Sequence, residues 1–205
     1  MKTFLTSDAD TPDADLVAAY RAGDEAAFRV LIERYTKALY AFIYRYFSNV
    51  GDTEDVVQET FIRVWRHLRT FDTQRSFKTW LYTIGRNVAL DLAKKKKAIL
   101  LSNFESLDEE PGDLLSTIVD PAPLPDEVFS RTELAQELEH MLQKLPPASR
   151  LVLHLHHHDQ LTFQEIAEII GEPLDTVKSR YRRSLVRLRN MLVPSETAPK
   201  CPPQS

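Results

Sequence analysis

The chain has 205 residues, 43% of them hydrophobic, and is therefore long enough to bury one or two cores. It contains only five glycines and few alternating strand-like patterns, which predicts an all-α fold. No apolar run approaches the roughly twenty residues of a membrane-spanning helix, and the N-terminus is too polar for a signal peptide. The single cysteine, Cys201, excludes an internal disulfide, so we expect a cytoplasmic protein.

The net charge of −4 does not by itself indicate a nucleic-acid-binding protein, but the charge is unevenly distributed. Residues 98–130 carry eight acidic side chains and no basic ones. Residues 1–97 carry 16 basic and 13 acidic side chains, and residues 131–205 carry 10 basic and 9 acidic ones. Two mildly basic segments therefore flank an acidic segment whose composition disfavours a packed core.

The first third of the chain predicts amphipathic helices. A short helix is expected over residues 13–22, ending at Gly23. Asp24 should cap a long helix that continues to about Phe47, with apolar residues at spacings of three and four. Such an apolar stripe is typical of core packing.

The next helix is expected to begin at Asp52 and to expose an acidic and polar face. Its inward-facing positions are predicted to be Val56, Val57, Phe61, Val64, Trp65 and Leu68. The helix dipole alone favours acidic residues in a first turn, which accounts for Asp52 and Asp55. It accounts less well for Gln58 and Glu59, which lie further along the helix.

A loop over residues 71–75 precedes a helix that Ser76 should cap and that should run to about Lys97. This part of the chain is basic, with Arg75, Lys78, Arg86 and Lys94 to Lys97. The terminal lysines also suit a helix C-terminus. Cations and aromatic side chains beside a polar loop suit a single-stranded nucleic acid, whose bases stack or enter pockets.

Four histidines, His154 and His156 to His158, gather at the end of a helix predicted over residues 148–157. An earlier helix over 131–145 ends at two prolines. His154 and His158 are four residues apart, as in some metal sites, but the sequence offers no third ligand at a recognisable distance. We therefore expect no metal site.

Residues 161–180 predict a helix-turn-helix. Thr162 and Glu165 have the spacing of a capping box, and Gly171 should end the first helix. Asp175 should cap the second helix, whose apolar positions are predicted to be Val177, Tyr181, Leu185 and Leu188. Its other face carries Lys178, Arg180, Arg182, Arg183, Arg187 and Arg189, as a helix that enters the major groove of DNA requires.

Three segments in this order resemble the extracytoplasmic-function (ECF, group IV) RNA polymerase sigma factors of bacteria: residues 52–65, 71–91 and 145–185. The resemblance implies two small helical domains joined by a flexible acidic linker. Region 2 would span residues 13–98, the linker 99–130 and region 4 residues 131–192. Residues 1–12 and 193–205 would form a disordered N-terminus and a flexible tail.

The resemblance also implies roles for individual residues. Polymerase would be bound by Asp52, Asp55, Gln58, Glu59, Phe61 and Trp65. The −10 promoter element would be bound by Phe71, Asp72, Arg75, Ser76, Phe77, Lys78, Arg86 and Asn87. The −35 element would be bound by Thr176, Lys178, Ser179, Arg180, Arg182 and Arg183.

The implied partners are the clamp helices and flap of core RNA polymerase, promoter DNA and an anti-sigma factor. No enzymatic activity, cofactor or small-molecule substrate is expected. The histidine-rich segment departs from the family pattern, which is usually more aromatic and acidic there. Two alternatives remain at this point: a stand-alone helix-turn-helix regulator, and a metal-responsive sensor built on the histidines.

Overall fold

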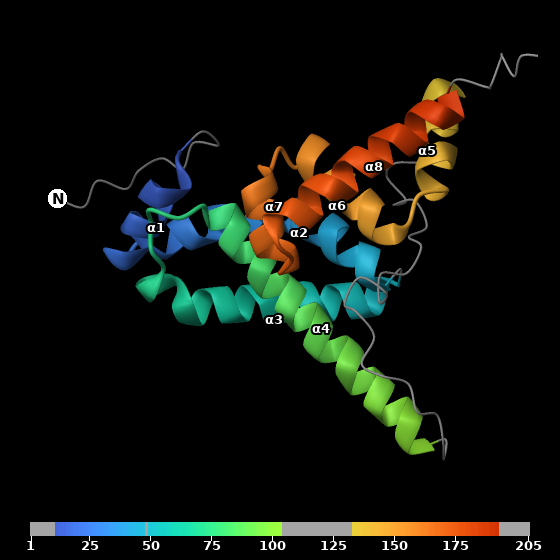
Figure 1. Cartoon of the computed structure of the whole chain (residues 1–205). Coiled ribbons are helices and arrows are strands. Elements are labelled where there is room, and N and C mark those ends of the chain that lie inside the picture. Colours follow the sequence, from blue (N-terminus) through green and yellow to red (C-terminus); the bar gives the residue numbers. More distant parts are fainter. Residues whose placement is uncertain (1–10, 48, 104–132, 193–205) are drawn as a thin grey trace, which may run out of the picture.

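A computed structural model describes residues 11–47, 49–103 and 133–192. These residues form eight α-helices and one short 3-10 helix, with no strand among them, which confirms the predicted all-α fold (Figure 1). The elements are α1 (Asp13–Arg21), α2 (Glu25–Phe47), α3 (Val50–His67), η1 (Leu68–Thr70), α4 (Phe77–Asn103), α5 (Glu133–Gln143), α6 (Pro147–His157), α7 (Phe163–Ile170) and α8 (Leu174–Leu192).

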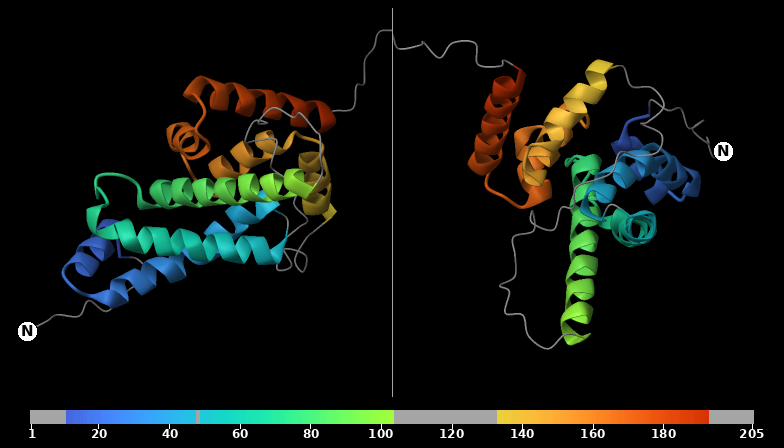
Figure 2. Two further views of the ribbon diagram at one scale, coloured as in Figure 1. Left: turned by 90° about the horizontal axis from the view of Figure 1, so that it is seen from below. Right: turned by 90° about the vertical axis from the view of Figure 1, so that its right-hand side faces the viewer.

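The first four helices form one group, in which α2 packs against α1, α3 and α4. Helix α4 packs against α3 and crosses it, and in the right-hand view of Figure 2 α3 is seen nearly end-on while α4 is seen side-on. Leu31, Leu39, Phe42 and Ile43 of α2 are fully buried, because the predicted apolar stripe faces these neighbours. This group positions the loop between η1 and α4.

Helices α5 to α8 form a second group, in which α8 packs against α5, α6 and α7. The capping box predicted at the start of α7 is present, since the Thr162 side chain accepts from the backbone N–H of Glu165 and the Glu165 carboxylate accepts from that of Thr162. Gly171 ends α7 with φ of 70°, a left-handed conformation that favours glycine. The helix-turn-helix is therefore confirmed.

The two groups share one hydrophobic core rather than standing apart. Helix α7 lies across α4, as Figure 1 shows, and their contact joins the groups. Tyr82 and Leu81 of α4 belong to the same buried cluster as Ile166 and Ile169 of α7. The start of α4 is therefore covered by the C-terminal helices.

Two predicted helix starts were wrong by a few residues. Helix α3 begins at Val50, because the side chain of Asn49 accepts the backbone N–H of Asp52 at 2.8 Å. Asp52 is thus a first-turn residue and not the cap. Helix α8 begins at Leu174, so Asp175 likewise lies in its first turn, where its charge complements the helix dipole.

Two predicted inward-facing residues are exposed. The Trp65 side chain on α3 and Leu185 on α8 have 54% and 42% of their surface accessible. On α8 the buried position one residue earlier is Ser184, whose hydroxyl donates to the carbonyl of Arg180 at 2.8 Å. The apolar pattern therefore overestimated how much of each helix faces the core.

Helix α4 continues to Asn103, past residue 99, where the linker was expected to begin. The remainder of the expected linker, residues 104–130, lies outside the described residues, as do residues 1–10 and 193–205. Among the residues that the structure describes, no helix combines the length and apolar character needed to cross a membrane.

Replacing the capping hydroxyl should weaken the C-terminal group. We expect Thr162→Ala to lower the free energy of unfolding by about 1 kcal/mol, because it leaves a backbone N–H of α7 without its partner. The measurement is urea denaturation followed by circular dichroism. Thr36→Ala is the matched control, since the exposed Thr36 hydroxyl only donates to the carbonyl of Ile32 within α2. Equal losses in both variants would contradict the role of the cap.

Candidate nucleic-acid interface

A surface pocket of about 390 Å³ lies beside the loop between η1 and α4. It is lined by His67, Thr70, Phe71, Asp72, Arg75, Trp80 and Ile84. Asp72 shapes the loop, since its side chain accepts the backbone N–H of Gln74 and its carbonyl that of Arg75, both at 3.0 Å. The pocket thus combines polar residues of the loop with the apolar side chains of Phe71, Trp80 and Ile84. A pocket of this kind can bind a nucleic-acid base.

Three aromatic rings pack together beneath the loop backbone, in tilted and edge-to-face arrangements. The ring centroid of Phe71 lies 4.5 Å from that of Trp80 and 5.7 Å from that of Phe77. Phe71 and Phe77 have only 6% and 3% of their surface accessible. Both were predicted to contact DNA, but in this conformation their rings belong to the core. The guanidinium of Arg21 holds the loop by donating to the carbonyl of Phe71.

Four residues that line the pocket were not predicted as site residues from the sequence: His67, Thr70, Trp80 and Ile84. Nor was Arg21, which binds the loop. Trp80 and Ile84 were placed in the core by their helical spacing, and spacing alone does not reveal that a core residue also borders a pocket. Arg21 comes from a different helix, and no local pattern connects it to the loop.

The polar residues predicted to meet the −10 element separate into two sets. Asp72 and Asn87 are exposed, and Ser76 is exposed but also donates a hydrogen bond to Glu165 of α7. Arg75 instead forms an ion pair with Glu168 of α7, and the ammonium of Lys78 donates to the backbone carbonyl of Asp159 at 2.5 Å.

Arg86 also faces the C-terminal group. A Cβ atom added at Gly171 would lie 2.9 Å from its Nη2 atom, so the absence of a side chain at Gly171 leaves room for this guanidinium. Three of the predicted DNA-binding cations therefore contact the C-terminal group.

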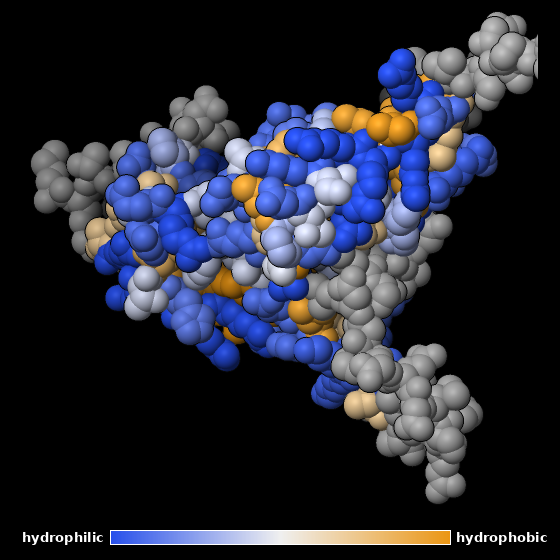
Figure 3. All heavy atoms as spheres, in the orientation of Figure 1, coloured by the Kyte–Doolittle hydropathy of each residue, from blue (hydrophilic) through white to orange (hydrophobic). Residues whose placement is uncertain are grey.

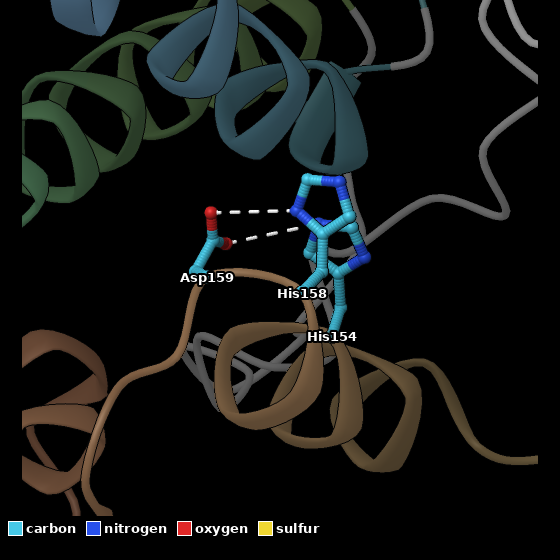
Figure 4. Close-up of side chains that lie close together, drawn as sticks. All are labelled: His154, His158 and Asp159. Atoms are coloured by element: carbon cyan, nitrogen blue, oxygen red, sulfur yellow. Dashed lines mark ion pairs between the residues drawn. The ribbon is translucent and has the colours of Figure 1, made fainter.

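The carboxylate of Asp159, which follows α6, lies at the centre of this contact (Figure 4). Only 4% of its side chain is accessible. Its Oδ1 atom accepts from the Tyr82 hydroxyl at 3.2 Å and lies 3.6 Å from the Lys78 ammonium. The rings of His154 and His158 stack beside it, with centroids 4.4 Å apart. The sequence showed the histidine pair but not its relation to Asp159.

These three side chains have the donor atoms of a metal site, within 4.8 Å of one another. Two protein cations already surround them, however. The Nη2 atom of Arg45 lies 2.9 and 2.8 Å from the two ring nitrogens of His154, and Lys78 neighbours Asp159. The arrangement therefore fits a polar contact among α2, α4 and the end of α6, with Arg45 and Lys78 as its cations, better than a cation-binding site.

Burial, followed by the positive charge of Arg45, lowers the pKa of His154 from 6.5 to about 2. His154 is consequently neutral near pH 7, and its 3.7 Å approach to Asp159 is not a pairing of charges. The charge of Asp159 is matched by Lys78.

Helix α3 presents a face that is both acidic and apolar. Asp55 and Gln58 are exposed, as are Trp65 and Ile62, which have 54% and 43% of their surface accessible. Trp65 was predicted both to face the core and to bind polymerase, and its exposure adds an aromatic side chain to the acidic surface. Such a surface is typical of a protein-binding site.

Two acidic residues of this face already have partners within the chain. Asp52 pairs with Lys96 of α4, and a hydrogen bond from Asn49 followed by one from Lys96 lowers its pKa. Glu59 pairs with Arg63 at 2.8 Å. Phe61, also predicted to bind polymerase, is only partly exposed.

Helix α8 presents the predicted basic face. Ser179, Arg182 and Arg183 are exposed, and the spacing of three and four residues brings them to one side together with Lys178. Arg180 points elsewhere and pairs with Glu172 at 2.8 Å. Figure 3 shows mainly hydrophilic side chains along α8, with an apolar group toward the end that lies near α5.

The neutral state of His154 predicts a pH dependence. Below pH 6.5 the unfolded chain gains a proton at His154 that the folded chain does not, so stability is lost as the pH falls. We expect His154→Gln to remove about 1 kcal/mol of the loss between about pH 7.5 and about pH 5.5 in urea denaturation. The exposed His140→Gln is the control; an unchanged loss in His154→Gln would contradict the prediction.

Comparison with known proteins identifies the family that this chain resembles. The family model "Sigma-70 region 2" matches residues 31–99, and "Sigma-70, region 4" matches residues 141–190. The ECF RNA polymerase sigma factor SigW of Bacillus subtilis is 36% identical over 84% of this chain and 92% of its own length. The ECF RNA polymerase sigma-E factor of Escherichia coli is 34% identical over 89% of this chain and 95% of its own length.

A solved structure has the same fold. The sigma factor RpoE of Bartonella quintana, in complex with the anti-sigma factor NepR, has a TM-score of 0.58 and 25% identity over 80% of this chain and 96% of its own. Proteins of this family are transcription initiation factors and not enzymes. The chain belongs to the ECF RNA polymerase sigma factors.

Proposed function

We propose that this protein acts in the cytoplasm, where it binds core RNA polymerase, directs it to promoters with −35 and −10 elements and helps to open them. The observation that carries the proposal is the order of three surfaces in one chain. These are the acidic and apolar face of α3, the pocket beside α4, and the basic face of α8. Phosphodiester chemistry would belong to the polymerase.

The face of α3 is assigned to the basic clamp helices of the large polymerase subunit. Asp55 and Gln58 supply exposed polar groups, and Trp65 supplies the aromatic side chain that such interfaces favour. Asp52 and Glu59 would exchange their present partners, Lys96 and Arg63, for polymerase residues. Opposite charges would also speed association.

The pocket beside α4 is assigned to a base of the non-template strand that flips out as the −10 element opens. A flipped base loses its stacking and its pairing, and the pocket offers replacements for both. Trp80 and Ile84 supply apolar surface, and Asp72 supplies hydrogen-bonding atoms. The exposed Ser76 and Asn87 would contact the same strand.

The face of α8 is assigned to the major groove of the −35 element. Arg182, Arg183 and Lys178 can contact base edges, and Thr176 and Arg180 can contact phosphates. Because Arg180 is paired with Glu172, its phosphate contact would require that pair to open.

Regulation by an anti-sigma factor, in a stress or envelope response, completes the proposal. Structural relatives support it, since the Bartonella quintana sigma factor was solved in complex with its anti-sigma factor NepR.

In-vitro transcription with core polymerase on a pool of promoter fragments tests the proposal. We expect specific transcripts only when the protein is present, and alignment of their start sites would supply the promoter sequence. If no transcripts appear and the protein does not co-elute with core polymerase, a stand-alone helix-turn-helix regulator becomes the better explanation.

Arg183→Ala should weaken discrimination among −35 sequences while leaving polymerase binding intact. A lost base contact removes about 1–3 kcal/mol of discrimination, measurable as competition between matched and mismatched promoter fragments. Arg189→Ala, also exposed on α8 but further along the helix, is the control. Equal effects of the two variants would contradict the assignment of Arg183.

Asp55→Lys should weaken polymerase binding, because it places a positive charge against basic clamp helices, while leaving the −35 contact unchanged. We expect about a tenfold loss of affinity in co-elution or anisotropy assays with core polymerase. Glu33→Lys, an equal charge change on an exposed position of α2, is the control. Equal polymerase affinity in these two variants would remove α3 from the interface.

A further inference from the structure

The proposed −35 surface lies on a helix that few side chains hold against the rest of the protein. The structure describes every residue of α8, and only Val177 and Ser184 are buried there. The Ser184 hydroxyl donates to the carbonyl of Arg180 within the same helix, so this hydrogen bond does not connect α8 to another element. Tyr181 lies between the two buried positions, at the spacing of four and three residues that places all three on one face.

The Tyr181 ring lies at the junction of α6, α7 and α8. Its centroid is 5.1 Å from that of His156 and 5.7 Å from that of His157, both at the end of α6. It is also 4.9 Å from the ring centroid of Phe163, the first residue of α7. Aromatic pairs in tilted and edge-to-face arrangements attract one another beyond what their burial contributes. Tyr181 therefore connects α8 to both preceding helices.

A hydrogen bond adds direction to this junction. The Tyr181 hydroxyl and the Nε2 atom of His157 are 3.1 Å apart. Ring packing alone tolerates sliding, whereas a hydrogen bond weakens steeply as its angle departs from linearity. The pair therefore specifies the rotation of α8 about its own axis as well as its distance from α6.

The end of α6 is itself held in place. A backbone carbonyl can only accept, so Nδ1 of His156 donates its proton to the carbonyl of Leu161 at 2.8 Å. The backbone N–H of Leu161 donates in turn to the carbonyl of Leu155 at 3.0 Å. The His156 ring also stacks on Phe163, with centroids 4.4 Å apart. The end of α6 consequently offers Tyr181 a fixed support.

We infer that His157 and Tyr181 are positioning residues for −35 recognition, which hold α8 in the rotation at which its arginines meet base edges. The inference rests on the proposed −35 role of α8. Arg182 and Arg183 follow Tyr181 directly and are exposed. Side chains lie about 5–6 Å from a helix axis, so a rotation of about 15° moves their atoms by more than about 1 Å. A shift of that size disrupts the hydrogen-bond geometry that base recognition needs.

The histidine-rich segment thereby acquires a role in part. His154 and His158 pack beside Asp159, whereas His156 and His157 contact α8. The four histidines therefore divide into two pairs. One lies at the contact with α2 and α4, and the other supports the −35 surface.

The test measures discrimination among DNA sequences rather than binding alone. Core polymerase and the full chain transcribe a promoter fragment obtained from the pool assay, with its −35 element randomised. The measured quantity is the enrichment of preferred over average −35 sequences among the transcripts. Tyr181→Phe removes the hydroxyl and keeps the ring, and His157→Phe removes the ring nitrogens and keeps an aromatic side chain. Tyr40→Phe, at a partly exposed position of α2, is the matched control.

We expect Tyr181→Phe and His157→Phe each to lower the enrichment about three- to fivefold relative to Tyr40→Phe, the effect of one lost hydrogen bond. The double variant should lose no more than either single variant, because both remove the same bond. His157→Gln should restore most of the enrichment, since an amide can pair with the hydroxyl. Urea denaturation of every variant is measured in parallel, because a purely structural role would lower stability without changing the enrichment.

Three outcomes would overturn the inference. If both single variants keep the enrichment of the control while their stability falls, the pair only stabilises the fold. If the losses add in the double variant, the two residues do not act through their shared hydrogen bond. If the wild type itself shows no preference within the randomised element, the −35 assignment fails and the inference fails with it. The first two outcomes leave the wild-type preference intact, so the two failures are distinguishable.

Discussion

The packing of α7 across the beginning of α4 is the contact on which the arrangement of the whole molecule depends. It joins two helical groups into one hydrophobic core, with Leu81 and Tyr82 on one side and Ile166 and Ile169 on the other. Apolar burial supplies most of the stabilisation, since each such side chain contributes about 1.5–3 kcal/mol when removed from water. The polar groups around it determine which surfaces remain accessible.

Those polar groups serve two purposes at once. Glu165 caps α7 and binds Thr79, while Asp159 accepts from Tyr82 and approaches Lys78. A buried carboxylate is tolerated only with partners of this kind, because an unpaired charge in the core is costly. The same partners occupy cations that a DNA strand would need. The packing of α7 on α4 therefore engages Lys78, which is proposed to bind the −10 strand.

The other two surfaces are left open by this packing. Helix α3 keeps Asp55 and Trp65 exposed, and α8 keeps Arg182 and Arg183 exposed. The pocket beside α4 is also accessible, although three cations near it, Arg75, Lys78 and Arg86, contact the C-terminal helices.

The all-α class, the capping box of α7, the stop at Gly171 and the family were predictable from the sequence, because helix periodicity and capping are local properties of neighbouring residues. Tertiary structure decided what depends on distant contacts. In the folded chain Trp65 is exposed, whereas Phe71 and Phe77 are buried. The N-cap of α3 is Asn49, and Asp159 lies beside Lys78 and Tyr82. Spacing along one helix specifies a face, whereas the residues that cover that face come from elsewhere in the chain.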